Sequence, residues 1–230
     1  KDHGFDVADW VHHFAEQKEA AFYTIKSGQT YCYDIDRKEH LKIPGQDAFI
    51  ILDNIRESKE IMSNKDLVAT DLGDGIMNIE FRSKMNSIGG DVLNGINAAM
   101  DIAERDYDGV VISNTGDNFS VGADIGMIFM FAVEQEYEEL NSAIKYFQDT
   151  MMRMRYSSIP TVAAPHQMAL GGGCELSMHA DKVVAHAETY IGLVEFGVGV
   201  IPGGGGTKEL TRRAAKTFQK DDVQVNRLRE

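Results

Sequence analysis

The sequence predicts an α/β domain in which strands and helices alternate, preceded by a smaller N-terminal extension. Three nearly all-apolar runs, at residues 109–113, 161–164 and 182–185, are typical of strands buried on both faces. Helices are predicted at residues 92–103, from an apolar stripe, and at residues 134–155. Because parallel strands need crossover connections, this alternation indicates a layered α/β fold with right-handed crossovers.

The predicted extension, residues 1–65, contains a helix and a hairpin. Residues 1–20 predict a short amphipathic helix, because apolar side chains recur about one helical turn apart at Val7, Trp10, Val11, Phe14 and Ala15. Residues 21–35 predict a hairpin, in which β-favouring residues flank a Ser-Gly-Gln turn. Residues 55–63 are expected to form another short helix. A block of this size lacks the mass for a core of its own, so we expect it to pack on the rest of the polypeptide.

The main domain is predicted to span residues 66–230. It begins with a second hairpin, in which residues 67–70 and 76–81 flank a Gly-Asp-Gly turn. The helices and buried strands named above follow in sequence. The strand at 161–164 leads toward three consecutive glycines, which makes the segment after it the first place to look for chemistry.

The composition excludes several classes of partner. With 23 basic and 36 acidic side chains among 230 residues, the formal net charge is −13, which argues against non-specific binding to nucleic acid. No apolar run approaches the roughly 18 residues needed to cross a bilayer, and the first residues lack a signal-peptide pattern. The two cysteines, Cys32 and Cys174, cannot staple a chain of this length. These features predict a cytoplasmic globular protein without a nucleic-acid or membrane partner.

Two turns rich in small residues could carry chemistry. The glycines at 171–173 precede a helical stretch, and such a turn exposes unpaired backbone N–H groups where the helix dipole favours negative charge. Residues 119–125 place small residues before another possible helix, for which Asp124 could be the N-cap. Either turn could cradle a phosphate or a developing oxyanion, or could serve only tight packing.

Two glutamates lie close to these turns in the sequence. Glu175 follows the three glycines, and Glu195 has apolar neighbours on both sides. If both carboxylates face one cavity, desolvation and mutual repulsion raise the pKa of at least one of them, which divides acid and base work between the pair. Without a shared cavity, each is an ordinary loop charge.

The histidines and Cys174 are the other reactive side chains, and most of them are interpreted as structural residues. The histidines lack the spacing and carboxylate neighbours of a metal site, so no metal is expected. Cys174 has no base beside it in the sequence and is interpreted as a small core residue. His166 could touch a substrate, because it precedes the glycine turn.

In this order and spacing, three segments resemble motifs of the crotonase (enoyl-CoA hydratase/isomerase) superfamily. Residues 119–125 resemble its first oxyanion-loop motif, residues 169–176 its second, and residues 199–207 its Pro-Gly turn. The resemblance covers roughly residues 66–214. It implies a core of stacked ββα units, to which residues 1–65 add the helix-plus-hairpin extension.

The resemblance also implies a site for an acyl-CoA thioester. It places the two backbone N–H donors of an oxyanion hole at Ala123 and Gly172, and substrate-binding positions at Val121, Asp124 and Gly171. Backbone donors aimed at a developing charge are worth roughly 3–4 kcal/mol each.

The pair Glu175 and Glu195 implies an enoyl-CoA hydratase of fatty-acid β-oxidation, because hydratases of the family carry two such glutamates about twenty residues apart. In the implied mechanism both carboxylates hold a water molecule, Glu175 assists its attack at C3 of a trans-2-enoyl-CoA, and Glu195 exchanges the proton at C2. The alternatives are an enoyl-CoA isomerase, a thioester hydrolase of the same fold, or a catalytically silent module for acyl-CoA binding or assembly.

Residues 163–168 and 188–195 are similar to the hydratase part of bifunctional enzymes that also contain a 3-hydroxyacyl-CoA dehydrogenase. We therefore expect a fragment of such a fusion, truncated at its C-terminus, with residues 1–65 as the connector. The resemblance implies no cofactor in this fragment; coenzyme A enters only as the thioester substrate, and NAD belongs to an upstream dehydrogenase part. The expected partners are acyl-CoA and either a trimer-like homo-oligomer or a packed dehydrogenase domain.

Overall fold

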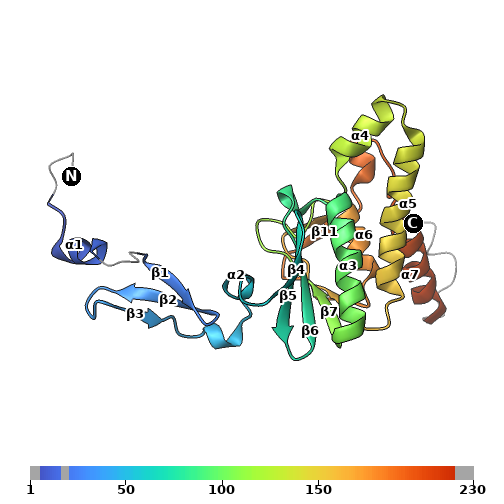
Figure 1. The fold of residues 1–230 in the computed structure, drawn as a ribbon. Coiled ribbons are helices and arrows are strands. Elements are labelled where there is room, and N and C mark those ends of the chain that lie inside the picture. Colours follow the sequence, from blue (N-terminus) through green and yellow to red (C-terminus); the bar gives the residue numbers. More distant parts are fainter. Residues whose placement is uncertain (1–5, 17–20, 221–230) are drawn as a thin grey trace. The chain divides into compact units, whose positions relative to one another are not determined.

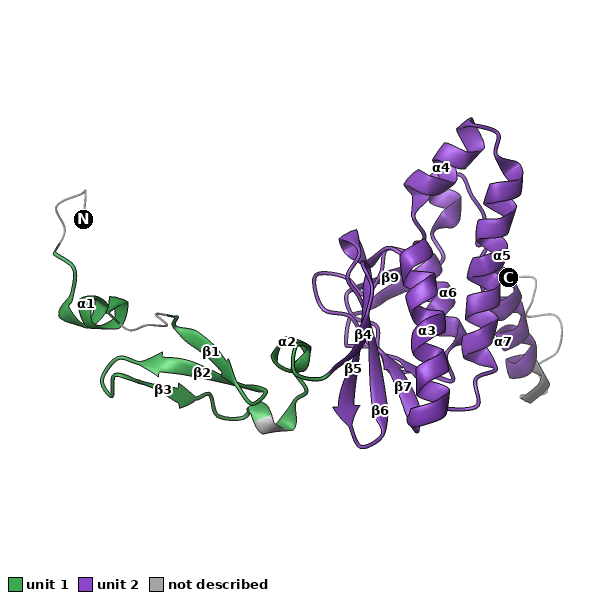
Figure 2. Ribbon diagram, viewed as in Figure 1, with its two compact units in different colours: residues 1–59 green, residues 60–230 purple. Residues whose placement is uncertain are grey.

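The computed structural model describes residues 6–16 and 21–220, which divide into two compact units (Figure 2). The units are residues 1–59 and residues 60–230, so the boundary falls before the predicted one at residues 65 and 66. The difference arises because β4 (Glu60–Ser63) pairs antiparallel with β5 (Leu67–Gly73) and joins the main sheet.

The first unit contains the predicted helix and hairpin, and both are confirmed. Helix α1 spans Asp9–Ala15, and strands β1 (Tyr23–Lys26) and β2 (Gln29–Asp34) pair antiparallel across the predicted turn. A third strand, β3 (Glu39–Lys42), extends the sheet and was not predicted. The short helices η1 (Gln46–Ala48) and α2 (Leu52–Ile55) follow.

This unit has a small aromatic core. The ring of Phe14 lies 4.9 Å from that of Phe22 and 4.7 Å from that of Tyr33, measured between centroids. Phe14 and Tyr33 are buried. These aromatic contacts lie within the unit, and the expectation that the block packs on the rest of the polypeptide stays a prediction.

The helix expected at residues 55–63 is the other local error. Its first part ends helix α2, and its second part is strand β4. Ile61 and Met62 of β4 pack on the hydrophobic core, which outweighs the weak helical preference of so short a segment.

The second unit is built on a six-stranded sheet with strand order β10-β8-β7-β6-β5-β4 (Figure 1). Strands β4, β5 and β6 (Ile76–Phe81) are antiparallel neighbours, which confirms the second predicted hairpin. Strands β7 (Gly109–Ile112), β8 (Thr161–Ala163) and β10 (Lys182–Val183) continue the sheet in parallel with β6. The predicted α/β fold class is confirmed.

Strands β7 and β8 are largely buried, as predicted, but β10 is not. Its two residues are exposed and half-buried, and Val184 after them is 57% exposed. β10 is an edge strand that pairs only with β8 among the described strands, so the apolar run at residues 182–185 is not covered on both faces.

Two long helices pack side by side along the sheet (Figure 1). They are α3 (Gly90–Asp106), which contains the predicted segment 92–103, and α5 (Tyr137–Arg155), which covers the predicted segment 134–155 except its first three residues. The core between them and the sheet includes Val92, Ile96, Met100, Met151 and Met154. Among the described helices none combines the length and apolar character needed to span a membrane.

A second, two-stranded layer consists of β9 (Met168–Leu170) and β11 (Tyr190–Gly192), which pair in parallel. The remaining elements of the second unit are η2 (Lys84–Asn86), α4 (Ile125–Val133), α6 (Gly172–His179), η3 (Glu195–Val198) and α7 (Gly206–Lys220). Helix α6 contacts β9, α5 and α7.

Candidate active site

The two predicted oxyanion turns run side by side. An isolated parallel bridge joins Ser120 to Ala169 of β9, with the Ser120 N–H donating to the Met168 carbonyl at 3.1 Å and the Leu170 N–H donating to the Ser120 carbonyl at 2.9 Å. The chain after Ser120 therefore follows the chain after Ala169. This pairing brings together segments that lie about fifty residues apart in the sequence.

Gly122 and Gly172 allow the two turns to approach closely. A Cβ atom on Gly122 would lie 2.9 Å from the Gly172 nitrogen, and one on Gly172 would lie 3.1 Å from the Ala123 nitrogen. Gly122 also has a φ of +95°, a region that other residues rarely adopt. The backbone nitrogens of Ala123 and Gly172 are thus neighbours only because glycines occupy these positions.

Neither of these two N–H groups has an acceptor in the part of the chain that the structure describes. Gly172 is the first residue of α6, where an N–H group has no intrahelical partner. The positive end of the α6 dipole lies at the same place. Two adjacent free donors at a helix start form a geometry that accepts a carbonyl oxygen gaining negative charge.

Glu175 lies one turn into α6 and is 3% exposed. Its Oε1 accepts a hydrogen bond of 2.8 Å from the Gly206 N–H, at the start of α7. Burial raises the pKa of this carboxyl, the charge of Glu195 raises it further, and the Gly206 N–H opposes both effects. The side chain is held in place, and no cation of the described residues forms an ion pair with it.

Glu195 begins η3, and β11 brings it to the same region. The Gly171 N–H donates to the Gly192 carbonyl at 2.9 Å, and Glu195 Oε1 lies 3.3 Å from the position that a Cβ on Gly171 would occupy. Its Oε2 is buried and has no hydrogen-bond partner among the described residues. A buried carboxylate oxygen without a donor is costly, which indicates a place for a water molecule or a substrate group.

The charges of both carboxylates, Glu175 and Glu195, act on the thiol of Cys174. Burial raises the pKa of its thiol to about 11, and the charges of Glu195 and Glu175 contribute in that order. The thiol is therefore protonated at neutral pH and is a poor nucleophile, as the sequence interpretation predicted. Cys174 is a buried core residue between two functional candidates.

The other predicted site residues lie around these turns. Val121 is half-buried beside Gly122, and Gly171 has a φ of +51° in the left-handed region immediately before α6. Asp124 is exposed, and its side chain caps α4 by accepting the Met127 N–H at 3.3 Å. Its substrate-binding role stays a prediction.

His166, a possible substrate contact in the sequence analysis, lies against the loop that contains Gly116 and Phe119. The His166 Nε2 lies 3.0 Å from the Gly116 carbonyl oxygen, and the ring packs edge-on to Phe119. Within the described residues no group of His, Cys, Asp and Glu side chains could hold a metal ion.

The sequence interpretation missed the role of the four-glycine turn in holding Glu175. A Cβ on Gly204 would collide with Glu175 Oε2 and with the ring of Phe147, and the Gly206 N–H binds the other carboxylate oxygen. A run of four glycines is the signal that could have found it, since repeated glycine often marks close approach of the backbone to another group.

The buried Glu209 of α7 was missed as well. Its side chain is 1% exposed and contacts Arg155 at 2.5 Å and Arg212 at 3.0 Å, measured from guanidinium nitrogen to carboxylate oxygen. Burial opposes the ionisation of Glu209, but Arg212 and Arg155 outweigh it and lower its pKa. These ion pairs of Glu209 join α7 to α5. They thereby fix the position of α7, whose first residue, Gly206, donates its N–H group to Glu175.

The fold and the site together define a class of protein: an α/β scaffold in which two backbone N–H groups without a described acceptor lie near two carboxylates. The chain belongs to the enoyl-CoA hydratase/isomerase family, whose sequence profile matches residues 71–227. The predicted resemblance is confirmed.

Relatives and solved structures agree with this family. The chain is 40% identical over 208 residues to a protein of Bacillus subtilis named "Probable 3-hydroxyacyl-CoA dehydrogenase", covering 90% of this chain and 26% of that protein. It is 32% identical to a "Putative fatty acid oxidation complex trifunctional enzyme" of Rickettsia felis, covering 78% of this chain and 25% of that protein. The crystal structure of enoyl-CoA hydratase from Thermoplasma volcanium superposes with a TM-score of 0.58 at 28% identity, covering 65% of this chain and 59% of that one.

The chain spans about a quarter of the length of these two curated relatives. Their names combine dehydrogenase and fatty-acid oxidation functions, while the structural neighbour is a hydratase. The match to only part of such relatives is consistent with the predicted fragment of a fusion.

Proposed function

We propose that this chain is the enoyl-CoA hydratase module of a longer protein that also contains a 3-hydroxyacyl-CoA dehydrogenase. The observation that carries the proposal is the pair of carboxylates, Glu175 and Glu195, beside two free backbone donors. The unpartnered Glu195 Oε2 supports it most directly, because a water molecule would supply the missing donor. The names of the relatives support the dehydrogenase part.

In the proposed reaction, the thioester carbonyl oxygen of a trans-2-enoyl-CoA accepts hydrogen bonds from the N–H groups of Ala123 and Gly172. These donors stabilise the enolate and make C3 more electrophilic. A water molecule held by both glutamates attacks C3 and transfers a proton to Glu175. Glu195, protonated when the substrate binds, delivers its proton to C2, so that the elements of water are added across the double bond. Transfer of the proton from Glu175 back to Glu195 restores both carboxyl groups as 3-hydroxyacyl-CoA leaves.

Every group in this scheme is a backbone amide, a carboxylate, water or substrate. We therefore propose that the module needs no cofactor of its own, with coenzyme A present only as the thioester and NAD used by the dehydrogenase part. The cytoplasmic location predicted from the composition belongs to the same proposal.

The test is to incubate the purified chain with crotonyl-CoA and follow the loss of the conjugated enoyl-thioester absorbance. We expect hydration to 3-hydroxybutyryl-CoA, identified by mass and by its oxidation with added dehydrogenase and NAD. Release of free coenzyme A would indicate a thioester hydrolase, and conversion of a 3-enoyl-CoA without hydration would indicate an isomerase. Binding of crotonyl-CoA without any turnover would indicate the silent module.

The proposed role of Glu175 as base predicts a pH dependence. Burial and the charge of Glu195 raise the pKa of Glu175 above that of a free glutamate. Since a base must be ionised, kcat/KM should fall as the pH drops through this raised pKa. We expect the acid limb of the pH profile to inflect above the pKa of a free glutamate, and carbon-13 NMR of labelled glutamates should show one carboxyl group titrating at the same raised pH. An inflection at or below the value of a free glutamate would contradict the role.

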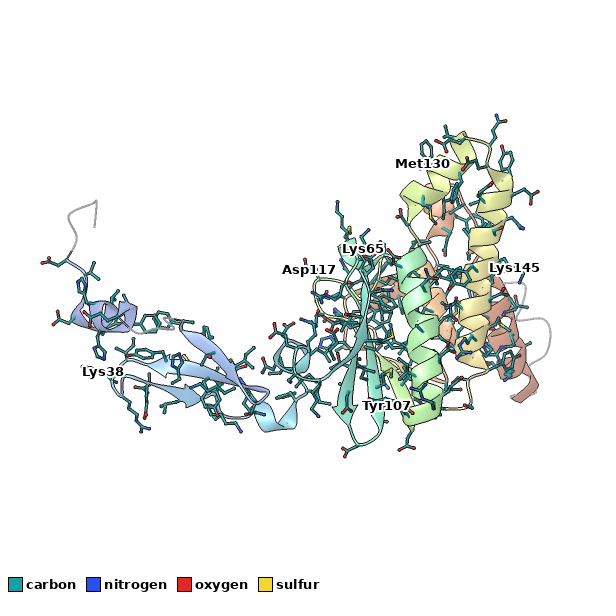
Figure 3. The ribbon with its side chains drawn as sticks, viewed as in Figure 1. Lys38, Lys65, Tyr107, Asp117, Met130 and Lys145 are labelled. Carbon is teal, nitrogen blue, oxygen red and sulfur yellow. The ribbon has the colours of Figure 1, made fainter. Side chains whose placement is uncertain are left out.

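Helix α4 supports the proposed association with a partner. It is almost entirely apolar, yet none of its residues is buried; Phe129, Met130 and Val133 are 68%, 57% and 63% exposed. The side chain of Met130 points outward in Figure 3. Such an exposed apolar patch is typical of an interface. We propose that it packs against another copy of the chain or against the dehydrogenase part.

This association is testable on the isolated chain. We expect sedimentation velocity to show self-association that increases with concentration, and Phe129→Glu to shift it toward the monomer, because each buried apolar side chain contributes about 1.5–3 kcal/mol. Lys145→Glu, on the exposed face of α5, is the control (Figure 3). If neither concentration nor Phe129→Glu changes the sedimentation, and the dehydrogenase part does not bind, the patch is not an interface.

A further inference from the structure

The cavity at the C-terminal end of α6 contains cations that the proposed reaction does not use. Its volume is about 380 Å³, and its lining includes Arg155, His179, Asp181, Arg212, Arg213 and Lys216. Four of these six side chains are cationic at neutral pH, in a chain whose net charge is −13. Such a local accumulation of positive charge in an acidic protein favours an anionic ligand.

Protein contacts orient these cations but do not neutralise all of them. Arg155 and Arg213 both donate to the Met178 carbonyl oxygen, at 3.0 and 2.7 Å. A carbonyl oxygen has no net charge, so this contact positions two guanidinium groups at the end of α6 and leaves the charge of Arg213 in the cavity, whereas Arg155 is also paired with Glu209. Asp181 and Glu209 supply two carboxylates against the four cations.

The Lys216 ammonium group remains available to a ligand, whereas the Arg155 Nε, which has no hydrogen-bond partner within the described residues, is itself buried. Lys216 forms no ion pair within residues 6–16 and 21–220, and its side chain is exposed at the cavity. In contrast, the Asp181 carboxylate is already engaged, because its Oδ2 accepts hydrogen bonds from the Thr161 N–H at 2.8 Å and the Thr161 hydroxyl at 3.2 Å.

The cavity is separate from the oxyanion site. Helix α6 begins at Gly172, the proposed oxyanion donor, and ends at His179, which lines the cavity. Eight residues span about 12 Å, and every residue of α6 is buried. The helix therefore has no open surface along which one ligand could extend from the oxyanion site to the cavity.

We propose that this cavity is a second ligand site, which binds a small molecule through a phosphate group. Guanidinium groups hold phosphate oxygens in a bidentate manner, and lysine supplies a further charge. Several converging cations suit a phosphate dianion better than a single carboxylate. The proposal goes beyond the hydratase function, and its binding test does not depend on turnover.

The test is isothermal titration of the whole chain with inorganic pyrophosphate. We expect saturable binding that Arg213→Ala combined with Lys216→Ala weakens about tenfold or more, because hydrogen bonds to charged groups are lost. The control pair, Arg105→Ala with Lys145→Ala, removes the same charges from exposed positions on α3 and α5 and should bind as the wild type does.

Two further measurements keep the proposal falsifiable. Lys216→Ala alone is also titrated, since Arg213 touches α6 and its loss could disturb the fold; we expect this variant to unfold at the wild-type temperature and to bind pyrophosphate more weakly. Saturating butyryl-CoA should leave pyrophosphate binding unchanged. Absence of binding, equal weakening in both double variants, or displacement by butyryl-CoA would overturn a separate phosphate site.

Discussion

Replacing Glu175 or Glu195 with Gln is expected to lower the turnover of crotonyl-CoA by about 10²–10⁴-fold in each case. The amide keeps the size and polarity of the side chain but cannot accept or deliver the proton. The binding of crotonyl-CoA should change little, because the donors at Ala123 and Gly172 are backbone groups. Steady-state kinetics and equilibrium binding on the same preparations measure the two effects.

Glu175→Gln should not destabilise the protein. A raised pKa in the folded state means that the ionised carboxyl opposes folding above the pKa of the unfolded chain, and this penalty grows until the pH exceeds the folded pKa. Gln removes the buried charge, while its Oε1 can still accept the Gly206 N–H. We expect a free energy of unfolding at pH 7 equal to or above that of the wild type.

Glu139→Gln, on the exposed side of α5, is the matched control and should keep full activity. Wild-type turnover by the Glu175 or Glu195 variant would remove that residue from the mechanism. Loss of turnover together with loss of crotonyl-CoA binding would show a structural rather than a chemical role.

Gly122→Ala is expected to reduce kcat by about 10²–10³-fold, the effect of losing one oxyanion donor. The added methyl group would lie 2.9 Å from the Gly172 nitrogen and 2.8 Å from the Leu170 carbonyl oxygen, so the two turns must separate. The pair of N–H groups can then no longer converge on one oxygen. Kinetics with crotonyl-CoA and chemical denaturation measure activity and stability together.

Gly116→Ala separates this effect from backbone strain. Gly116 has a φ of +93°, close to the +95° of Gly122, but a Cβ there would meet no atom within 4 Å. Both variants should therefore lose about 1–3 kcal/mol of stability from the unfavourable φ, and only Gly122→Ala should lose most of its activity. Similar kinetic losses in both variants would mean that strain, and not the distance between the turns, decides the rate.

Much of the fold follows from local patterns in the sequence. The hairpin of β5 and β6, the buried strands β7 and β8, and helices α3 and α5 were predicted because their periodicity or apolar character is contained within each segment. The errors fall where the position of a segment in the sheet, rather than its own residue pattern, decides the outcome. β4 has little local signal and forms because β5 provides a partner, and β10 is exposed because it lies at the edge of the sheet.

The sequence by itself determined the residue types of the candidate site: glycines before a helix start, Glu175 after them, and Glu195 about twenty residues later. Only the tertiary structure decided their arrangement. The bridge between Ser120 and Ala169 places the two free N–H groups side by side, and the pairing of β11 with β9 brings Glu195 against Gly171. These contacts join segments far apart in the chain, and hydrogen bonds between backbone groups leave no side-chain pattern in the sequence.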